Sequence, residues 1–344
     1  MEELGVNYGD RHRAFLQALL ARGTITFEES KPLLAEIMNA ENDGDLIRPE
    51  QVTEDEFEEY IQIAGQVASL FDYEVRNTLH QVTKQRIYAF VNTTSDPQTQ
   101  LATTFAPDEL AFVKRVLEAM FDKYNTPRME IMAITSMQAI KLARPDRRQS
   151  QSQPQPTQTQ VDPDSSQVQA ATDRGLKHSE VESIMNDLVG GEWFEKSREG
   201  FYSLSARALL ELRPWLIAMF NDTEAEADEW QRVKFCEACK EIVTVGLRCK
   251  NPGCMLRLHD HCQDAFWRAR RSKNCTKCEE EWTGDKYVGE RAVTMTEAYQ
   301  RGRRHGGRGT NLAEEVVQQN QGSEAEEEEE EEEEDGEDGQ EEEQ

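Results

Sequence analysis

The sequence predicts an α+β multidomain protein, and three observations support that fold class. Twice along the chain, apolar residues recur every three to four positions and then alternate with a period of two, which indicates short helices followed by a β-hairpin. All seven cysteines lie between Cys236 and Cys278, and sixteen acidic residues fall between Glu324 and Glu343. We therefore expect two tandem winged-helix domains, a small two-metal module and a disordered acidic tail.

Residues 8–98 are expected to form the first winged helix. Apolar residues spaced three to four apart predict three helices, because that spacing places them on one helix face. The first helix should end at Gly23, and the capping-box motifs Thr26-x-x-Glu29 and Thr53-x-x-Glu56 should open the other two. The residues expected to face the core are Phe15, Leu16, Leu19, Leu20, Leu33, Leu34, Ile37, Met38, Phe57, Tyr60, Ile61, Ala64, Val67 and Phe71.

Residues 102–225 are expected to repeat this order. Pro107 should begin a helix, since proline is favoured at a first helical position, and a second apolar helix is expected over 129–142. Ser179-x-x-Glu182 is a capping motif for a third helix. The intervening stretch of about 146–175 is rich in Gln, Ser and Pro and has no periodicity, so we expect a disordered insertion.

Each winged helix should close with a β-hairpin. The period of two runs over 75–79 and 87–91 in the first unit, and residues 193–194 and 201–204 are expected to form the hairpin of the second. A further helix, over 206–220, is expected to lead towards the cysteines.

The winged helices are predicted to dock proteins rather than read a DNA groove. A helix that enters the major groove needs basic or amide side chains towards phosphates and base edges. The candidate helices are acidic instead, with Glu28, Glu29 and Glu36 in one and Glu180, Glu182 and Asp187 in the other. Basic residues near the first hairpin and in segment 301–308 allow at most weak, non-specific contact with DNA.

The cysteines divide into four ligand pairs that one histidine completes. In order, these are Cys236-x2-Cys239, Cys249-x4-Cys254, His259-x2-Cys262 and Cys275-x2-Cys278. Eight ligands fill two tetrahedral Zn²⁺ sites with none left over, so we expect two zinc ions per chain. His261 is the rival histidine, but His259 leaves a two-residue gap before Cys262 that lets both reach one ion. The odd cysteine count and the absence of an apolar leader argue against a disulfide framework.

The ligand order indicates the kind of module. By analogy with known modules, pairs one and three should share one zinc and pairs two and four the other, although spacing alone also permits sequential sites. RING and PHD modules both place histidine fifth. A PHD finger has an aromatic residue two positions before its seventh ligand, where this chain has Lys273, and loop 240–248 offers no aromatic cage. Residues 233–284 are therefore predicted to be a variant RING.

The composition indicates several small hydrophobic cores rather than one large one. Hydrophobic residues make up 37% of the chain and the mean hydropathy is −0.78. No apolar run approaches the roughly 20 residues that a membrane span needs. More than half of the net charge of −28 comes from the acidic run near the C-terminus. We expect residues 285–344, basic and then acidic, to be disordered.

Several sequence blocks occur together in one order: His12-Arg13-Ala14-Phe15-Leu16-Gln17, Ile87-Tyr88-Ala89-Phe90-Val91-Asn92, Thr104-Phe105-Ala106-Pro107-Asp108-Glu109-Leu110 and Gly200-Phe201-Tyr202-Ser203-Leu204-Ser205-Ala206-Arg207-Ala208. With the variant RING and Trp282, they resemble non-structural maintenance of chromosomes element 1, the RING subunit of the SMC five–six complex, in its fungal form. The resemblance covers most of residues 10–284. It implies winged helices that hold a MAGE-type partner, contact with a kleisin subunit, work in DNA repair in the nucleus, and ubiquitin ligase activity that the MAGE partner assists.

A RING ligase forms no covalent intermediate; it positions a ubiquitin-charged conjugating enzyme. The docking positions that the resemblance implies are Ala238, Phe266, Trp267, Thr276 and Glu279, with Phe266 and Trp267 on the central helix. A proline is usual at the position of Thr276 and a basic residue at that of Glu279, so we expect weak, partner-dependent activity. The alternatives are a structural zinc module that serves assembly with little ligase chemistry and, third, a PHD-like histone reader.

Overall fold

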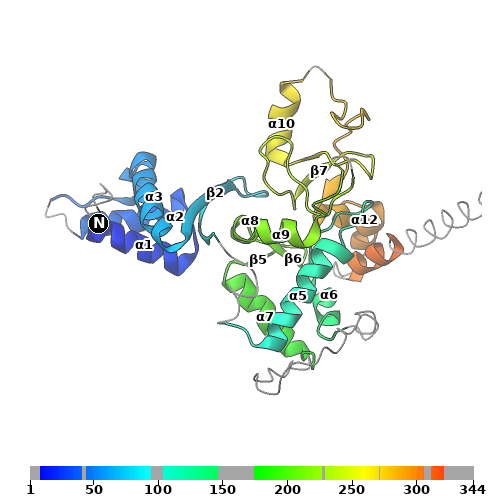
Figure 1. Ribbon diagram of the computed structural model, residues 1–344, viewed down its shortest axis with the longest axis horizontal. Helices are drawn as coiled ribbons and strands as arrows, with labels where there is room; N and C mark the ends of the chain where they lie inside the picture. Colours follow the sequence, from blue (N-terminus) through cyan, green and yellow to red (C-terminus); the bar gives the residue numbers. More distant parts are fainter. Residues whose placement is uncertain are drawn as a thin grey trace, which may run out of the picture.

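The computed structural model describes residues 8–40, 44–93, 104–145, 174–226, 229–270, 272–305 and 311–320. They form two helical units, a module that contains all the cysteines, and C-terminal helices (Figure 1). The acidic run and nearly all of the predicted insertion lie outside these residues. Within the part described, no helix is both long enough and apolar enough to pass through a membrane.

The first unit contains the three predicted helices and the predicted hairpin. Its elements are α1 (Asp10–Arg22), β1 (Thr24–Thr26), α2 (Phe27–Asn39), η2 (Pro49–Gln51), α3 (Glu54–Ala68), η3 (Ser69–Phe71), β2 (Tyr73–Leu79) and β3 (Arg86–Asn92). The Thr26 amide donates to Glu29 at 2.9 Å, and the Glu29 amide donates back to the Thr26 hydroxyl at 3.3 Å. Thr53 and Glu56 repeat this arrangement, so both capping boxes are confirmed.

The sheet of the first unit is antiparallel in the order β1-β3-β2, with a core of its own beneath it. The strand β1 was not expected; it is three residues long and pairs with β3 between Thr24 and Ala89. Two residues expected in the core are exposed, Leu20 at 52% and Phe71 at 69%. Phe71 lies beyond the end of α3, in η3, so it leaves the apolar face that the helical spacing defines.

The second unit repeats the helix, strand, helix, helix, strand, strand order of the first. Its elements are α5 (Pro107–Glu118), the π-helical turn η4 (Ala119–Lys123), β4 (Ile134–Thr135), α6 (Ser136–Lys141), α7 (His178–Gly190), β5 (Phe194–Lys196) and β6 (Phe201–Leu204). The sheet order, β4-β6-β5, also matches that of the first unit. The same topology therefore occurs twice.

The helix predicted over 129–142 is wrong in its first half. Helix α6 begins only at Ser136, after Thr135 caps it by accepting from the Gln138 amide. Met132 has a φ of +44°, which no helix interior tolerates. The preceding Glu130 is buried against the cysteine-containing module, and this tertiary contact outweighs the local helical pattern.

Two other helix boundaries differ from expectation. Helix α7 is capped at Lys177, whose amide donates to Glu180 at 2.7 Å, rather than at Ser179. The helix predicted over 206–220 is divided into α8 (Ala206–Glu211) and α9 (Arg213–Phe220). Pro214 causes this break, because it has no N–H to donate to the Leu210 carbonyl.

The C-terminal region contains a third sheet. Its elements are β7 (Gly246–Arg248), β8 (Arg257–Leu258), α10 (Asp260–Arg268), β9 (Tyr287–Val288), α11 (Arg291–Thr294) and α12 (Glu297–Arg304), and residues 311–320 are helical. The antiparallel strands have the order β8-β7-β9. The prediction that 285–344 is disordered is therefore wrong for 285–305 and 311–320.

A few apolar residues and one glycine fold this segment back. Tyr299 and Val316 are buried, each in a short stretch that also contains charged and polar residues, which concealed their helical spacing. Gly289, at a φ of +85°, turns the chain from β9 into α11. A Cβ atom at this position would lie 2.4 Å from the Thr244 carbonyl oxygen, so the turn requires glycine.

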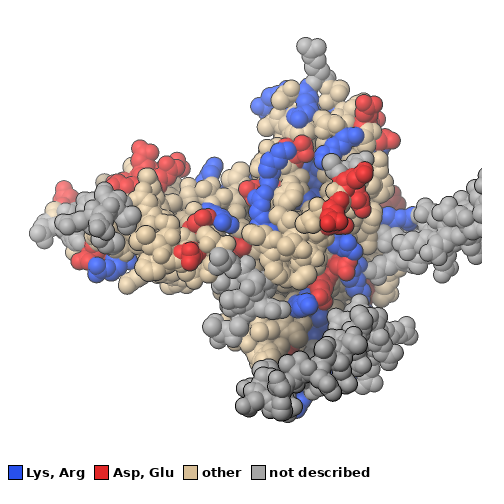
Figure 2. Space-filling view, in the orientation of Figure 1, with Lys and Arg blue, Asp and Glu red and all other residues tan. Residues whose placement is uncertain are grey.

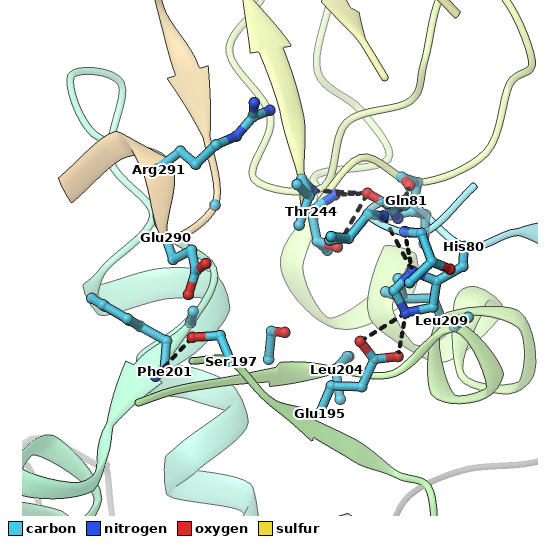
Figure 3. Close-up of a pocket in the computed structure, with 18 of the residues that line it drawn as sticks. His80, Gln81, Glu195, Ser197, Phe201, Leu204, Leu209, Thr244, Glu290 and Arg291 are labelled. Atoms are coloured by element: carbon cyan, nitrogen blue, oxygen red, sulfur yellow. Dashed lines mark hydrogen bonds and ion pairs between the residues drawn. The ribbon is translucent and has the colours of Figure 1, made fainter. Parts of the chain in front are cut away.

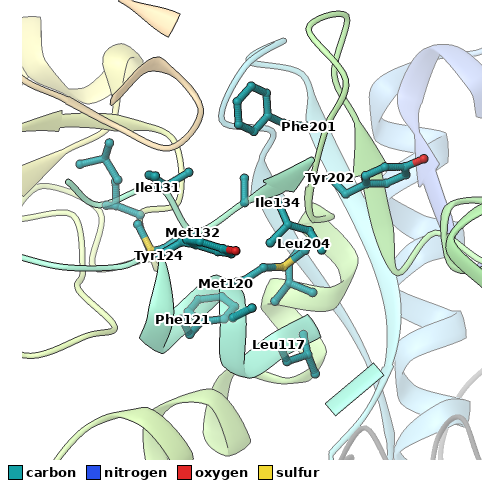
Figure 4. Packing of buried hydrophobic residues seen from close by; sticks show 14 of the residues in the cluster. Leu117, Met120, Phe121, Tyr124, Ile131, Met132, Ile134, Phe201, Tyr202 and Leu204 are labelled. Atoms are coloured by element: carbon teal, nitrogen blue, oxygen red, sulfur yellow. The ribbon is translucent and has the colours of Figure 1, made fainter. Parts of the chain in front are cut away.

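One hydrophobic core extends through the second unit, the cysteine-containing module and the C-terminal helices. Figure 4 shows part of it, with Met120 and Phe121 of η4 in the same cluster as Ile131 and Ile134. The first unit keeps a separate core. The second unit, the module and the C-terminal helices are therefore one body, to which the first unit is attached.

Candidate zinc centres

The first ligand cluster joins the first and third ligand pairs. Cys236, Cys239, His259 and Cys262 place their donor atoms within 4.8 Å of one another. The first two cysteines precede β7, while His259 follows β8 and is the N-cap residue of α10. The Nδ1 atom of His259 lies 3.3 Å from the Cys239 sulfur, so this nitrogen faces the centre of the cluster.

The contact of the second ring nitrogen of His259 indicates which nitrogen carries the proton. Its Nε2 atom lies 3.2 Å from the Ile242 carbonyl oxygen. Because a carbonyl can only accept, Nε2 carries the proton and leaves the Nδ1 lone pair for a metal ion. Metal-binding histidines in general have such an outer partner, which sets ring orientation.

The second ligand cluster joins pairs two and four: Cys249, Cys254, Cys275 and Cys278. The Cys249 and Cys278 sulfurs are 3.5 Å apart, and those of Cys254 and Cys275 are 3.4 Å apart. A tetrahedral site with Zn–S bonds of about 2.3 Å places its sulfurs about 3.8 Å apart, close to these values. The clusters interleave, so the cross-brace expected by analogy is present and sequential sites are excluded.

The thiol chemistry also suits zinc. All seven cysteines are free thiols, not disulfides. Burial raises the pKa of both Cys249 and Cys262 to about 11, so these two thiols do not ionise readily near neutrality without a cation, whereas a hydrogen bond with Cys239 lowers the pKa of Cys236. Zinc supplies that charge and is bound by thiolates. The clusters are the ligand sets of two zinc ions.

His261 lies beside the first cluster rather than in it. Its ring stacks on that of His259, with centroids 5.0 Å apart and an interplanar angle of 10°. The donor set around Cys236 contains His259 and not His261. Burial lowers the pKa of His261, which therefore favours the neutral ring.

The five docking positions implied by the resemblance fall into two groups. Ala238, Thr276 and Glu279 lie at or near the surface, and Glu279 has a φ of +61°. Phe266 and Trp267 are only 5% and 8% exposed, so neither is accessible at the surface of α10, where docking of a conjugating enzyme would require it. The Arg270 guanidinium covers the Phe266 ring at 3.4 Å, and Trp267 packs on Trp282 with ring centroids 5.3 Å apart.

A buried ionic cluster beside the zinc ligands was not foreseen. Glu130 is 1% exposed and Arg257 is fully buried, and the two form a forked ion pair in which Nε donates to Oε2 at 2.8 Å. Lys234 and Arg248 each lie 3.5 Å from the same carboxylate. No sequence pattern signals this cluster, because Glu130 is about a hundred residues away from its partners.

Opposing effects act on the ionisation of this cluster. Burial alone would raise the pKa of Glu130, but the surrounding cations, Arg257 foremost, outweigh it and hold the pKa below its usual value. Burial lowers the pKa of Lys234 to about 7, although Glu130 opposes that shift. The carboxylate therefore remains charged, and it joins the second unit to the zinc module.

The charges of the helices before the hairpins also bear on function. In the first unit, the helix that directly precedes the hairpin is α3 rather than α2, which corrects the choice of candidate helix. Figure 2 shows acidic side chains gathered over α3, and its exposed acids are Glu54, Asp55, Glu58 and Glu59. In the second unit, Glu180, Glu182 and Asp187 of α7 are exposed as expected. Neither helix presents a basic surface to a DNA groove.

Two interleaved zinc sites around a short helix and a small sheet define a protein with a RING-like module. A family model described as a RING-like domain matches residues 236–278. A second model, described as the Nse1 non-SMC component of the SMC5-6 complex, matches residues 12–212. The chain belongs to the Nse1 family.

The individual relatives share little sequence identity with this chain, but each match extends over most of the relative's length. The human protein named non-structural maintenance of chromosomes element 1 homolog is 22% identical over 273 residues, covering 79% of this chain and 84% of the relative. The fission yeast relative, Schizosaccharomyces pombe non-structural maintenance of chromosomes element 1, is 24% identical over 221 residues, covering 64% and 74%. A solved chain from an Nse1-Nse3-Nse4 complex shares the fold, with a TM-score of 0.58, 18% identity, and coverage of 81% of this chain and 98% of that chain.

Proposed function

We propose that this chain is the RING-type ubiquitin ligase subunit of an SMC5–6 complex and acts in the nucleus in DNA repair and chromosome maintenance. The observation that supports this most is the interleaved pair of zinc sites in a chain of the Nse1 family. Such a module catalyses transfer by position: it holds a conjugating enzyme so that its ubiquitin thioester meets a substrate lysine.

In this proposal, zinc holds the loops in place and takes no part in the transfer itself. The conjugating enzyme contacts Ala238 beside the first site and Thr276 and Glu279 beside the second. Ala238 offers little apolar area, and the Glu279 carboxylate lacks the donors that a basic side chain would offer to ubiquitin. Weak activity in the isolated chain follows from these residue types.

We further propose that both helical units are winged helices and that they hold a MAGE-type partner, with a kleisin subunit also in contact. The repeated topology and the likeness to a chain from an Nse1-Nse3-Nse4 complex support this assignment. The acidic helices α3 and α7 favour protein docking over groove reading, because acidic groups repel DNA phosphates. Contact with DNA is then weak and non-specific.

A second candidate function is assembly alone. The burial of Phe266 and Trp267 favours it, because α10 then offers no exposed aromatic residue to a conjugating enzyme. In this case the zinc module would serve as a rigid support for the second unit, with which it shares a core.

A ubiquitin-discharge assay separates the two functions. The full chain, alone and with its MAGE-type partner, is mixed with charged conjugating enzymes from a broad panel. We expect discharge barely above background for the chain alone and a clear increase with the partner. Glu279→Arg should increase the rate further, because guanidinium donors replace a carboxylate. A partner-bound chain that stays inactive with the whole panel, with no effect of Glu279→Arg, would favour assembly alone.

A further inference from the structure

The first unit joins the remainder of the molecule chiefly through α8, which packs on β3 and β2. Its core is separate, and the small apolar cluster that links it to α8 consists of Ala89, Val91 and Leu210. Polar contacts accompany this cluster: Thr24 donates to Glu192 at 2.6 Å, and Arg76 donates to the Leu210 carbonyl at 3.2 Å. Because the two large cores are separate, the first unit can shift while both stay intact.

The loop between β2 and β3 reaches the zinc module through the side chain of Gln81. Its Nε2 donates to the Ile242 carbonyl at 3.0 Å, and its Oε1 accepts from the amides of Thr244 at 3.0 Å and Val245 at 2.8 Å. Figure 3 shows the Gln81 side chain directed at Thr244. One side-chain amide thus holds segment 242–245, which follows the first two zinc ligands.

The same carbonyl oxygen orients a zinc ligand. Ile242 accepts from Gln81 and also from the Nε2 of His259, at 3.2 Å. A carbonyl has two lone pairs, so both bonds can form at once. Since the outer partner of a metal-bound histidine sets its ring orientation, Gln81 acts on the first zinc site through Ile242.

The neighbouring His80 holds the loop in the conformation that presents Gln81. Its Nδ1 lies 3.1 Å from the amides of Val82 and Thr83, which can only donate, so Nδ1 accepts and Nε2 carries the proton. Nε2 lies 3.0 Å from the nearer carboxylate oxygen of Glu195 in β5. The tip is thus tied to both the second unit and the zinc module.

A cavity of about 590 Å³ lies beside this tip, between the hairpin, the second unit and the zinc module. Leu204 and Leu209 contribute to its wall (Figure 3), and so does Ile242. The tip is therefore not packed tightly on that side, and its position depends on a few directional hydrogen bonds. Hydrogen bonds weaken steeply with distance and angle, so a short displacement of the tip breaks them.

We propose that Gln81 is a positioning residue that couples the placement of the first unit to the first zinc site. A partner seated on the first unit shifts the hairpin, and Gln81 transmits that shift to segment 242–245 and to His259. The consequence for ubiquitin transfer rests on the proposed function, because that function places the conjugating enzyme at Ala238, four residues before Ile242. The coupling itself does not depend on ligase activity.

The coupling is tested first in the full-length protein without a partner. Gln81→Ala should speed hydrogen exchange at the Thr244 and Val245 amides by about tenfold, because it removes their acceptor. It should also speed zinc release to a chelator from the first site, which contains His259, and leave the second, all-cysteine site unchanged. Gln85→Ala is the matched control, since Gln85 is an exposed glutamine of the same loop.

A conservative variant separates positioning from general support of the loop. Gln81→Glu keeps the accepting oxygen and loses the donor to Ile242, so it should restore amide protection but not slow zinc release. If Gln81→Ala leaves exchange and zinc release unchanged, or if Gln85→Ala has equal effects, the coupling is refuted. Equal rescue of both measurements by Gln81→Glu would also refute it.

The partner supplies the second test. Addition of the MAGE-type subunit should change exchange across 242–245 in the wild type but not in Gln81→Ala, with equal partner affinity. An unchanged wild type, or an equal change of exchange in both proteins, would refute the coupling. Equal stimulation of discharge in both proteins would refute its consequence for ubiquitin transfer. If discharge stays at background while exchange changes only in the wild type, the coupling stands and the proposed ligase function fails.

Discussion

Substitution of Glu130 by glutamine tests how the zinc module is held on the second unit. Glu130 is the carboxylate within reach of Arg257, Lys234 and Arg248, all of them nearly or fully buried. Glutamine preserves shape and volume but removes the charge, which leaves three buried cations without a counter-charge. Removal of one partner from a buried ion pair costs about 3–5 kcal/mol.

The measurements are urea unfolding and thermal unfolding, each monitored by tryptophan fluorescence. All five tryptophans lie between Trp193 and Trp282, in the body that contains Glu130, so the signal does not depend on the first unit. For a body of this size, a loss of 3–5 kcal/mol corresponds to a fall in Tm of roughly 6–20 °C. Deprotonation of Lys234 relieves part of the cost, since burial already lowers its pKa to about 7.

Two further variants make the result decisive. Asp122→Asn removes an ion pair with Arg232 whose side chains are 56% and 44% exposed, and it should cost less than about 1 kcal/mol. Lys234→Met in the Glu130→Gln background should recover part of the loss, because it removes one unpaired cation. A cost for Glu130→Gln no larger than that for Asp122→Asn would refute the reasoning and show that the cluster is solvated or discharged.

The remaining predictions concern the metal, DNA and pH. Metal analysis should give two zinc ions per chain, and Cys249→Ala should unfold the module, because structural zinc supplies much of its folding free energy; one zinc, or metal loss from His261→Ala but not from His259→Ala, would overturn the ligand assignment. The isolated chain should bind DNA weakly and salt-sensitively without a footprint, and a sequence-specific nanomolar complex at physiological salt would contradict this. Burial and the hydrogen bond to Glu199 raise the pKa of Tyr299 to about 12. Its contribution to stability should be complete below about pH 10 and lost as pH rises through 12, and Tyr299→Phe should flatten that loss in unfolding titrations.

Local chemistry was sufficient for the zinc ligands and for most of the secondary structure. Cysteine and histidine spacing identifies ligands because two side chains three to five positions apart can reach one ion, whatever surrounds them. Both capping boxes of the first unit and both hairpins were predictable for the same reason, since their hydrogen bonds join residues close together in the sequence. Only the grouping of the ligand pairs required an analogy, which the structure bears out.

Contacts between distant parts of the chain determined the rest. Glu130 prevents a helix at 129–133 because Arg257 binds it, and Tyr299 orders a charged segment because the second unit provides Glu199 and a core. The sequence does not indicate whether Phe266 or Trp267 is the exposed residue of the helix. In the structure both are buried, by neighbours that lie later in the chain. Nothing in the sequence distinguishes Gln81 from other loop glutamines, because only the fold places its Nε2 3.0 Å from the Ile242 carbonyl oxygen. The energies of these contacts depend on which groups meet in three dimensions, and no local pattern encodes that.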